Sequence, residues 1–199
     1  MGLLEDRVVL VNGGSQGVGA GVVRTAVGEG ATIVFTGRRA EVGEKLTFDQ
    51  HMAINLKAPF FAMQAAVADM TSRSAPGTIV NIGSNCAHGG PPYLAPYSTA
   101  KAGLAGLTRN AAHAHRFDRI RINTVNIGWT DTEGEDATQR AFHGAGDDWR
   151  EQAAARQPMG KLGQPDEIAD FVVFLLSDRS GVVTGSVIDW DQNVLGALD

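Results

Sequence analysis

The sequence is poor in the features that mark secreted, membrane and nucleic-acid-binding proteins. Its 199 residues include a single cysteine, Cys86, which excludes an intramolecular disulfide and a cysteine-based zinc site. No stretch approaches the roughly 18 consecutive apolar residues of a membrane span, and charged residues precede the first apolar run, the wrong order for a secretory signal. The net charge of −5 comes without clusters of Lys or Arg, which argues against nucleic acids and anionic membranes as partners. We therefore expect a cytoplasmic protein that acts on a small molecule.

Apolar residues make up 43% of the chain, and their spacing alternates between two patterns. Short β-branched runs predict strands at 7–11, 32–36, 78–82, 120–125 and 186–188. Between them, apolar residues recur at helical spacing and predict helices at 19–27, 52–67, 96–117 and 165–176. This alternation, with strands that are apolar throughout, is typical of a parallel sheet covered on both faces. The sequence thus predicts one α/β domain over residues 1–199, with a doubly wound parallel sheet.

A glycine-rich segment joins the first predicted strand to the first predicted helix. Gly13, Gly17 and Gly19 give the pattern G-x-x-x-G-x-G. In Rossmann-type folds such glycines permit a tight turn, let a pyrophosphate approach backbone N–H groups, and let the helix pack close to the sheet. We expect a dinucleotide phosphate cradle here, against the alternative of a flexible surface turn. Its expected members are Gly13, Ser15, Gln16, Gly17, Val18 and Gly19.

The end of the second predicted strand bears on the choice of cofactor. A site for NAD usually places Asp or Glu about 20 residues after the glycines, where it accepts from the ribose 2′-OH. Residues 31–40 contain no acid and instead include Arg38 and Arg39, whose guanidinium groups suit the 2′-phosphate of NADP. The sequence favours NADP(H), with NAD(H) as the alternative if both arginines are solvated loop residues.

A tyrosine and a lysine at helical spacing indicate acid–base chemistry. Tyr97 and Lys101 are four residues apart and share one face of the predicted helix 96–117. A phenol has an ordinary pKa of about 10, and an ammonium one turn away lowers that pKa toward neutrality. Ser84 follows the predicted strand 78–82, at the end of the strand where such sheets bind ligands. Tyrosine and lysine at this spacing, taken alone, also occur as an ordinary surface pair.

These motifs occur in the order found in the short-chain dehydrogenase/reductase family, which the sequence resembles over nearly its whole length. The stretch 121–132, RINTVNIGWTDT, follows them as it does in the family. The resemblance implies that Ser84 holds the substrate oxygen and that Tyr97 transfers its proton. It implies that Lys101 tunes Tyr97 and binds the cofactor ribose, and that Asn55 is a fourth catalytic residue.

The resemblance further implies an NAD(P)-dependent alcohol dehydrogenase or ketone reductase, which moves a hydride between the nicotinamide and a substrate carbon. Gly128, Thr130 and Thr132 would contact the nicotinamide end of the cofactor, and Tyr97 and Lys101 would also touch the cofactor. Homodimers or homotetramers are implied as well, since helices 52–67 and 96–117 carry apolar or small residues on more than one face. A second class of function stays open, namely a dinucleotide-binding sensor or scaffold without turnover.

Pro59 gives a physical reason for a free carbonyl at Asn55. It lies four residues later and has no N–H, so it cannot donate to that carbonyl, which the family is thought to use to hold a water. The alternative is a proline that merely kinks the helix against the sheet.

The largest departure from the family lies between Leu46 and Thr47. There the family has a third strand, a helix and a central fourth strand ending in Asn-Asn-Ala-Gly, none of which this sequence contains. Without the central strand, strands 7–11 and 78–82 would keep unpaired backbone groups that are costly to bury. We therefore expect a missing segment at this point, which either belongs to a longer parent chain or has been deleted.

Residues 129–163 are polar, acidic and punctuated by glycine. We expect a substrate-covering loop region suited to a polar substrate, against the alternative of a solvated flap. Asp136, His143 and Asp147 in this region have no spacing that compels a metal site, and we expect none. Cys86 and His88 follow Ser84 closely; they either line the pocket or are a small buried thiol and an exposed loop imidazole.

Overall fold

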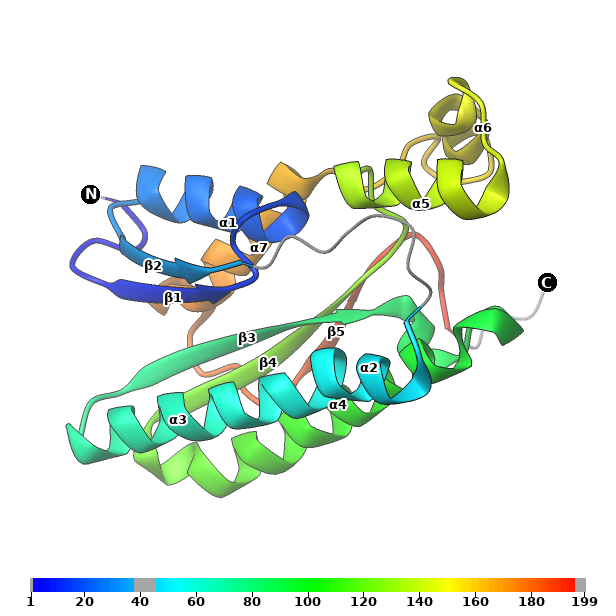
Figure 1. Ribbon diagram of the computed structural model, residues 1–199. Coiled ribbons are helices and arrows are strands. Elements are labelled where there is room, and N and C mark those ends of the chain that lie inside the picture. The colour runs from blue at the N-terminus through cyan, green and yellow to red at the C-terminus, as the bar shows by residue number, and fades with distance from the viewer. Residues whose placement is uncertain (1, 38–45, 196–199) are drawn as a thin grey trace. The chain divides into compact units, whose positions relative to one another are not determined.

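A computed structural model describes residues 2–37 and 46–195 (Figure 1). The strands are β1 (Val8–Asn12), β2 (Thr32–Thr36), β3 (Gly77–Ser84), β4 (Ile120–Ile127) and β5 (Val187–Trp190). The helices are α1 (Gly17–Gly28), α2 (Phe48–Met52), α3 (Ala58–Ser72), α4 (Ala95–His115), α5 (Glu133–His143), α6 (Trp149–Ala155) and α7 (Pro165–Leu176). A π-helical turn covers Ala53–Lys57, and short 3₁₀ turns cover Asn85–His88, Pro92–Leu94, Arg116–Asp118 and Asp178–Ser180.

These residues form two compact units. The first comprises 2–37, 128–173 and 190–195, and the second comprises 46–127 and 174–189. Parallel pairing is present in both, between β1 and β2 in the first unit and between β3 and β4 in the second. The predicted α/β class with parallel strands is therefore confirmed, and each predicted strand is found with its boundaries shifted by at most a few residues.

In the first unit, β1 and β2 lie in register from Val8 opposite Thr32 to Asn12 opposite Thr36. Helix α1 packs against this pair, and Asn12 Oδ1 accepts a hydrogen bond from the Thr36 hydroxyl at 2.7 Å. The Thr36 carbonyl accepts from the N–H groups of Gly13 and Gly14, both at 2.8 Å. The glycine segment is thus fixed to the end of β2 by its own backbone.

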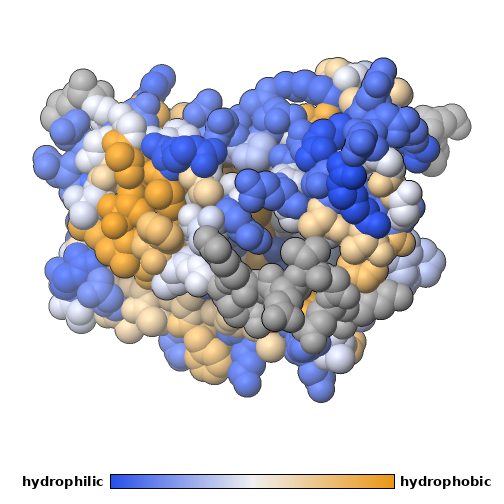
Figure 2. Space-filling view, turned by 45° about the horizontal axis from the view of Figure 1, so that its top comes forward, coloured by the Kyte–Doolittle hydropathy of each residue, from blue (hydrophilic) through white to orange (hydrophobic). Residues whose placement is uncertain are grey.

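The apolar side chains of β1 and β2 are largely exposed. Val8 and Leu10 expose 74% and 62% of their surface, and Val34 and Phe35 are also exposed. Figure 2 shows an apolar patch on the side of the molecule where β1 and β2 lie in Figure 1. Within the first unit, β1 pairs with β2 in a two-stranded sheet. Parallel strands usually have cover on both faces. Among the described residues α1 packs against this pair, and the apolar side chains named above stay exposed.

In the second unit, the strand order is β3-β4-β5, with β3 and β4 in register from Gly77 opposite Ile120 to Ser84 opposite Ile127. Helices α3 and α4 run side by side along one face of this sheet (Figure 1). Between the helices and the strands lies an apolar core formed by Met63, Val67, Ala112, Ile120 and Ile122. This core holds α4 against the sheet, with the N-terminal end of the helix near the carboxyl ends of the strands.

A buried polar network also joins α4 to the sheet. Asn81 Nδ2 donates to Thr108 Oγ1 at 2.9 Å, and Thr108 Oγ1 shares a hydrogen bond with Thr124 Oγ1 at 2.7 Å. The three residues come from β3, α4 and β4, and Thr108 and Thr124 are fully buried. A buried hydroxyl without a partner is costly, so this network fixes the register of α4 along the strands.

The helix predicted at 52–67 is not continuous, and the reason lies at Pro59. Residues Ala53–Lys57 form a π-helical turn between α2 and α3, in which the Ala58 N–H donates to the Ala53 carbonyl. Because proline has no N–H, the ordinary helical bond to the Asn55 carbonyl cannot form, and wider turns of this kind are frequent at functional sites.

The segment expected to be a long loop, 129–163, contains the two helices α5 and α6. Its acidic residues Glu133, Glu135 and Asp136 occupy the first turn of α5, where they stabilise the helix dipole. Among the described residues, no helix combines the length and the apolar character needed to cross a membrane.

We predict that Thr108→Val lowers the free energy of unfolding by about 1–3 kcal/mol, since it keeps the shape but leaves Asn81 and Thr124 without their shared partner. Thr138→Val is the matched control, because the Thr138 hydroxyl bonds only the Gly134 carbonyl on the surface of α5; it should change stability by less than about 0.5 kcal/mol. Urea denaturation measures both. Equal effects of the two substitutions would show that the network adds nothing.

Candidate active site

Ser84 is the last residue of β3 and is 6% exposed. Its side chain caps the following 3₁₀ turn, Asn85–His88, by accepting from the Cys86 N–H at 3.2 Å. The preceding Gly83 cannot carry a side chain, because an added Cβ would lie 2.0 Å from Asn126 Oδ1 on the neighbouring strand β4. The hydroxyl of Ser84 is thus placed at the carboxyl end of β3, as the sequence predicts.

Tyr97 and Lys101 lie in the first turns of α4 and close to the same strand end. Lys101 Nζ donates to the Ile82 carbonyl of β3 at 2.8 Å and lies 5.6 Å from the centre of the Tyr97 ring. Burial lowers the pKa of Lys101 to about 8. The structure therefore brings a phenol, an ammonium and, two residues beyond Ile82, the Ser84 hydroxyl to one end of the sheet.

Asn55 lies within the π-helical turn, and its side chain turns back along the helix. Asn55 Nδ2 donates to the His51 carbonyl at 3.2 Å, and the His51 ring meets the Tyr97 ring edge-on with 6.0 Å between centres. Contact between this segment and α4 depends on Gly103, where an added Cβ would lie 2.9 Å from Leu56 Cδ2. All four predicted catalytic residues therefore belong to the second unit, and His51 is a neighbour that sequence reasoning missed.

The glycine segment has the geometry of an anion cradle in the first unit. Gly13 and Gly17 have φ of 94° and 54°, values that favour glycine. An added Cβ at Gly19 would lie 2.0 Å from the Gly13 carbonyl oxygen, so only glycine fits. Gln16 precedes α1 without a side-chain cap, and the first turn holds no acid, so the N–H groups there suit a phosphate. These features fit the pyrophosphate of a dinucleotide.

The residues expected at the nicotinamide end lie in the same unit as this cradle. An added Cβ at Gly17 would lie 3.5 Å from the Thr132 methyl group, so Thr132 borders the glycine segment. Thr130 is buried, and its hydroxyl donates to the Gly128 carbonyl at 2.9 Å. The Gly128 N–H donates to the Trp190 carbonyl at 3.2 Å. Arg38 and Arg39, expected to select NADP, lie outside the described residues.

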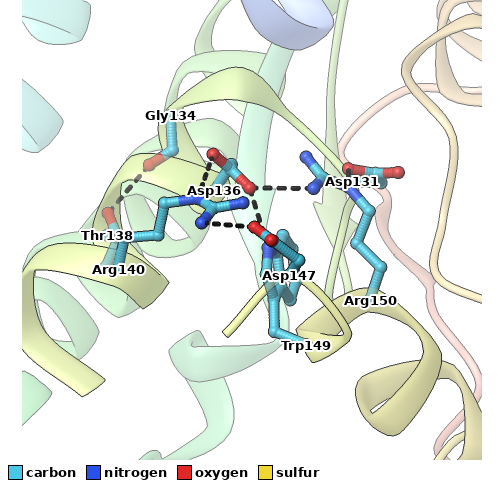
Figure 3. A network of polar contacts seen from close by, with 8 residues as sticks. All are labelled: Asp131, Gly134, Asp136, Thr138, Arg140, Asp147, Trp149 and Arg150. Atoms are coloured by element: carbon cyan, nitrogen blue, oxygen red, sulfur yellow. Dashed lines mark hydrogen bonds and ion pairs between the residues drawn. The ribbon is translucent and has the colours of Figure 1, made fainter. Parts of the chain in front are cut away.

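Figure 3 shows the ion pairs that connect α5 and α6. Arg150 bridges Asp131 and Asp136, both at 2.8 Å, and Arg140 bridges Asp136 and Asp147 at 3.0 and 2.9 Å. Hydrogen bonds from Trp149 and Arg140 lower the pKa of Asp136 to about 2. Within the described part of the chain, no cluster of three or more metal-ligating side chains is found. Asp136 and Asp147, considered above as metal ligands together with His143, both pair with Arg140.

The fold defines an α/β protein with parallel strands, in which Ser84, Tyr97 and Lys101 lie at one end of the second unit's sheet. In the comparisons with known proteins, residues 40–192 match a family model described as enoyl-(acyl carrier protein) reductase. The chain belongs to the short-chain dehydrogenase/reductase family.

Three relatives show how far the likeness extends. An uncharacterized oxidoreductase of Thermotoga maritima is 37% identical over 81% of this chain and 63% of its own length. The 2-(S)-hydroxypropyl-CoM dehydrogenase 3 of Xanthobacter autotrophicus is 35% identical over 72% of this chain and 56% of its own. The human (3R)-3-hydroxyacyl-CoA dehydrogenase is 36% identical over 71% and 52%. The chain thus spans about half to two thirds of the length of these relatives.

The fold has a counterpart among solved structures. The ligand-free aldohexose dehydrogenase of Thermoplasma acidophilum superimposes with a TM-score of 0.83 over 98% of each chain, at 22% identity. At this identity the likeness concerns the fold, and it confirms the Rossmann-type arrangement predicted from the sequence.

We predict that one of the four lysines of the chain titrates near pH 8 in the cofactor-free protein, and that this lysine is Lys101. Burial disfavours the charged amine, so the ammonium persists at neutral pH but loses its proton before an exposed lysine does. Between pH 8 and the pKa of 10.5 that an unperturbed lysine has, the unfolded chain binds more protons than the folded protein. The free energy of unfolding should therefore rise with pH in this range. NMR of reductively ¹³C-methylated lysines checks the titration, with Lys101→Arg assigning the resonance; four resonances that all titrate above pH 10 would contradict it.

Proposed function

We propose that this protein is an NAD(P)-dependent oxidoreductase that interconverts a carbonyl group and an alcohol. The observation that carries the proposal is the position of Lys101, whose ammonium bonds the end of β3 and lies beside the Tyr97 ring. A buried cation next to a phenol makes the phenolate accessible near neutral pH. Burial disfavours the charged form of a lysine, so a lysine with no role beyond packing would be more stable at the surface.

Each side chain of the second unit has a role in the proposed reaction. The Ser84 hydroxyl binds the substrate oxygen and holds it toward Tyr97. In reduction, the Tyr97 hydroxyl gives its proton to that oxygen; in oxidation, the Tyr97 phenolate takes the proton from the alcohol. Lys101 stabilises the phenolate, and the Asn55 carbonyl, which Pro59 cannot occupy, holds a water that returns the proton to solvent.

The first unit supplies the groups that fit the cofactor. Gly13, Gly17 and Gly19 leave room for a pyrophosphate at the start of α1, with Ser15, Gln16 and Val18 forming the rest of the segment. Gly128, Thr130 and Thr132 would hold the nicotinamide end. When bound, the nicotinamide gives or takes the hydride. We favour NADP(H), because Arg38 and Arg39 follow β2 where an acid would serve NAD(H).

The names of the relatives narrow the proposed substrate. The relatives named 2-(S)-hydroxypropyl-CoM and (3R)-3-hydroxyacyl-CoA dehydrogenase both carry a secondary hydroxyl group in the substrate part of the name. We therefore propose a secondary alcohol or the corresponding ketone. The acidic, arginine-braced α5–α6 segment is proposed to cover the substrate and suits a polar one.

We also propose that a segment is absent between Leu46 and Thr47. The exposed apolar side chains of Val8 and Leu10 support this proposal. A further parallel strand with its helix would cover these side chains. The shorter length of this chain relative to its matched relatives points the same way.

A panel of ketones and secondary alcohols, assayed with NADPH and NADH, tests the function. Tyr97→Phe should keep the affinity for cofactor, measured by fluorescence titration, and lose turnover by about 10²-fold or more, since only the proton donor is removed. Tyr93→Phe is the matched control, because Tyr93 is the other tyrosine of the chain and is 67% exposed; it should keep turnover.

Cofactor binding without turnover of any panel member would favour the sensor or scaffold instead. In the same titration, Arg38→Ala with Arg39→Ala should weaken NADPH binding much more than NADH binding, by charge loss at the 2′-phosphate. Lys101→Ala should weaken both turnover and cofactor binding. Unchanged NADPH affinity in the arginine variant would contradict the preference for NADP(H).

We further propose that the protein forms dimers or tetramers through α3 and α4. Phe60 and Phe61 on α3 are 43% and 53% exposed, more apolar surface than one sheet face covers. Phe61→Glu should therefore shift the mass measured by light scattering toward the monomer. Phe117→Glu is the control, since Phe117 is 85% exposed on the turn after α4 and should leave the mass unchanged. A monomeric parent protein would contradict this proposal.

A further inference from the structure

A histidine–aspartate pair lies beside the Ser84 strand end, outside the four proposed catalytic residues. His88 Nε2 lies 2.8 Å from Asp189 Oδ1, and Asn126 Nδ2 donates to the same oxygen at 2.9 Å. The three residues come from the 85–88 turn, from β4 and from β5, all within the second unit. Burial acts to raise the pKa of Asp189, but the hydrogen bonds from His88 and Asn126 hold it below its usual value.

The distances decide which atom donates. His88 Nε2 also lies 3.2 Å from Asn126 Nδ2, a contact that needs an unprotonated ring nitrogen. The contact with the Asp189 carboxylate is shorter and charge-assisted, and it needs a proton on Nε2. We therefore assign Nε2–H as the donor to Asp189, with Asn126 donating to the same carboxylate. The carboxylate accepts from two segments at once and ties them together.

This pair holds the far end of the turn that Ser84 begins. Ser84 Oγ accepts from the Cys86 N–H at one end of the 85–88 turn, and His88 is its last residue. Asn126 lies opposite Gly83 in the β3–β4 register, so close that an added Cβ on Gly83 would overlap its Oδ1. The turn is therefore fixed to β3 at its Ser84 end and to β4 and β5 at its His88 end.

We propose that His88 and Asp189 are positioning residues, which hold the Asn85–His88 turn and with it both partners of the Ser84 hydroxyl. Ser84 Oγ accepts from the Cys86 N–H at 3.2 Å and donates to Asn85 Oδ1 at 3.4 Å, the direction in which the substrate oxygen takes over the hydroxyl hydrogen. This inference rests on the proposed function for the role of Ser84, but the fixing of the turn does not. A hydroxyl hydrogen rotates to suit its hydrogen-bond partners. Both partners of Ser84 Oγ lie on the turn, so the orientation of the hydroxyl depends on the turn.

The single cysteine provides a direct probe of this turn. Cys86 lies between Ser84 and His88 and is partly buried, so its rate of alkylation by iodoacetamide reports how often the turn opens. His88→Phe keeps a ring but removes the donor, and it should raise the alkylation rate about tenfold, the effect of losing one charge-assisted hydrogen bond. His88→Gln can still donate an N–H to Asp189 and should stay close to the parent rate.

The chain offers a matched control. His115 Nδ1 and Asp118 Oδ2 also lie 2.8 Å apart, with side chains 33% and 41% exposed against 32% and 31% for His88 and Asp189, but at the opposite end of α4. His115→Phe should leave Cys86 alkylation unchanged. Asp189→Ala should match His88→Phe, and the double variant should add no further increase, as expected of one interaction.

Turnover on the panel ketone that the parent reduces supplies the second readout. His88→Phe should lower kcat/KM about tenfold or more, since small errors in the position of a catalytic group are costly, while His88→Gln should restore it and His115→Phe should not change it. An alkylation rate in His88→Phe equal to that of the parent would overturn the proposal, as would faster alkylation with unchanged turnover. Alkylation needs neither cofactor nor substrate. If the parent protein shows no turnover, the proposed function is refuted, and the alkylation rates still decide whether His88 and Asp189 fix the turn.

Discussion

The burial of the Lys101 ammonium is the constraint on which the second unit depends. A lysine so placed must find an acceptor, and the Ile82 carbonyl supplies it at 2.8 Å. This bond forms where α4, a helix of 21 residues, approaches the carboxyl end of β3, and together with the Thr108 network it sets the position of the helix along the sheet. Tyr97, one turn earlier, is carried to the same place.

The rest of the unit is built to permit that approach. Ala100, Leu104 and Ala105 of α4 are buried. The hydroxyl of Thr108 meets Asn81 and Thr124. On the other side, Gly103 lets Leu56 pack close to the α4 backbone. Close packing and a satisfied polar network both specify a single register, and that register places the phenol, the ammonium and the Ser84 hydroxyl together.

The two units hold different groups of candidate residues. The first unit holds a glycine segment whose positive φ values and short Gly19–Gly13 approach suit a phosphate. The second holds the proposed acid–base groups and the turn that His88 and Asp189 are proposed to position. The π-helical turn at Asn55 belongs to the second unit, and Pro59 is its physical cause. Each unit has its own parallel strands and its own packing.

The sequence by itself determined the strands, the glycine segment and the spacing of Tyr97 and Lys101, because all of these depend on local periodicity and backbone conformation. It did not determine that 129–163 folds into α5 and α6, since ion pairs between residues as far apart as Asp131 and Arg150 stabilise those helices. Nor could it reveal the edge-on contact of His51 with Tyr97, or that His88, Asn126 and Asp189 meet at one carboxylate. Those contacts join residues up to 101 positions apart, and only the folding of β3, β4 and β5 into one sheet brings them together.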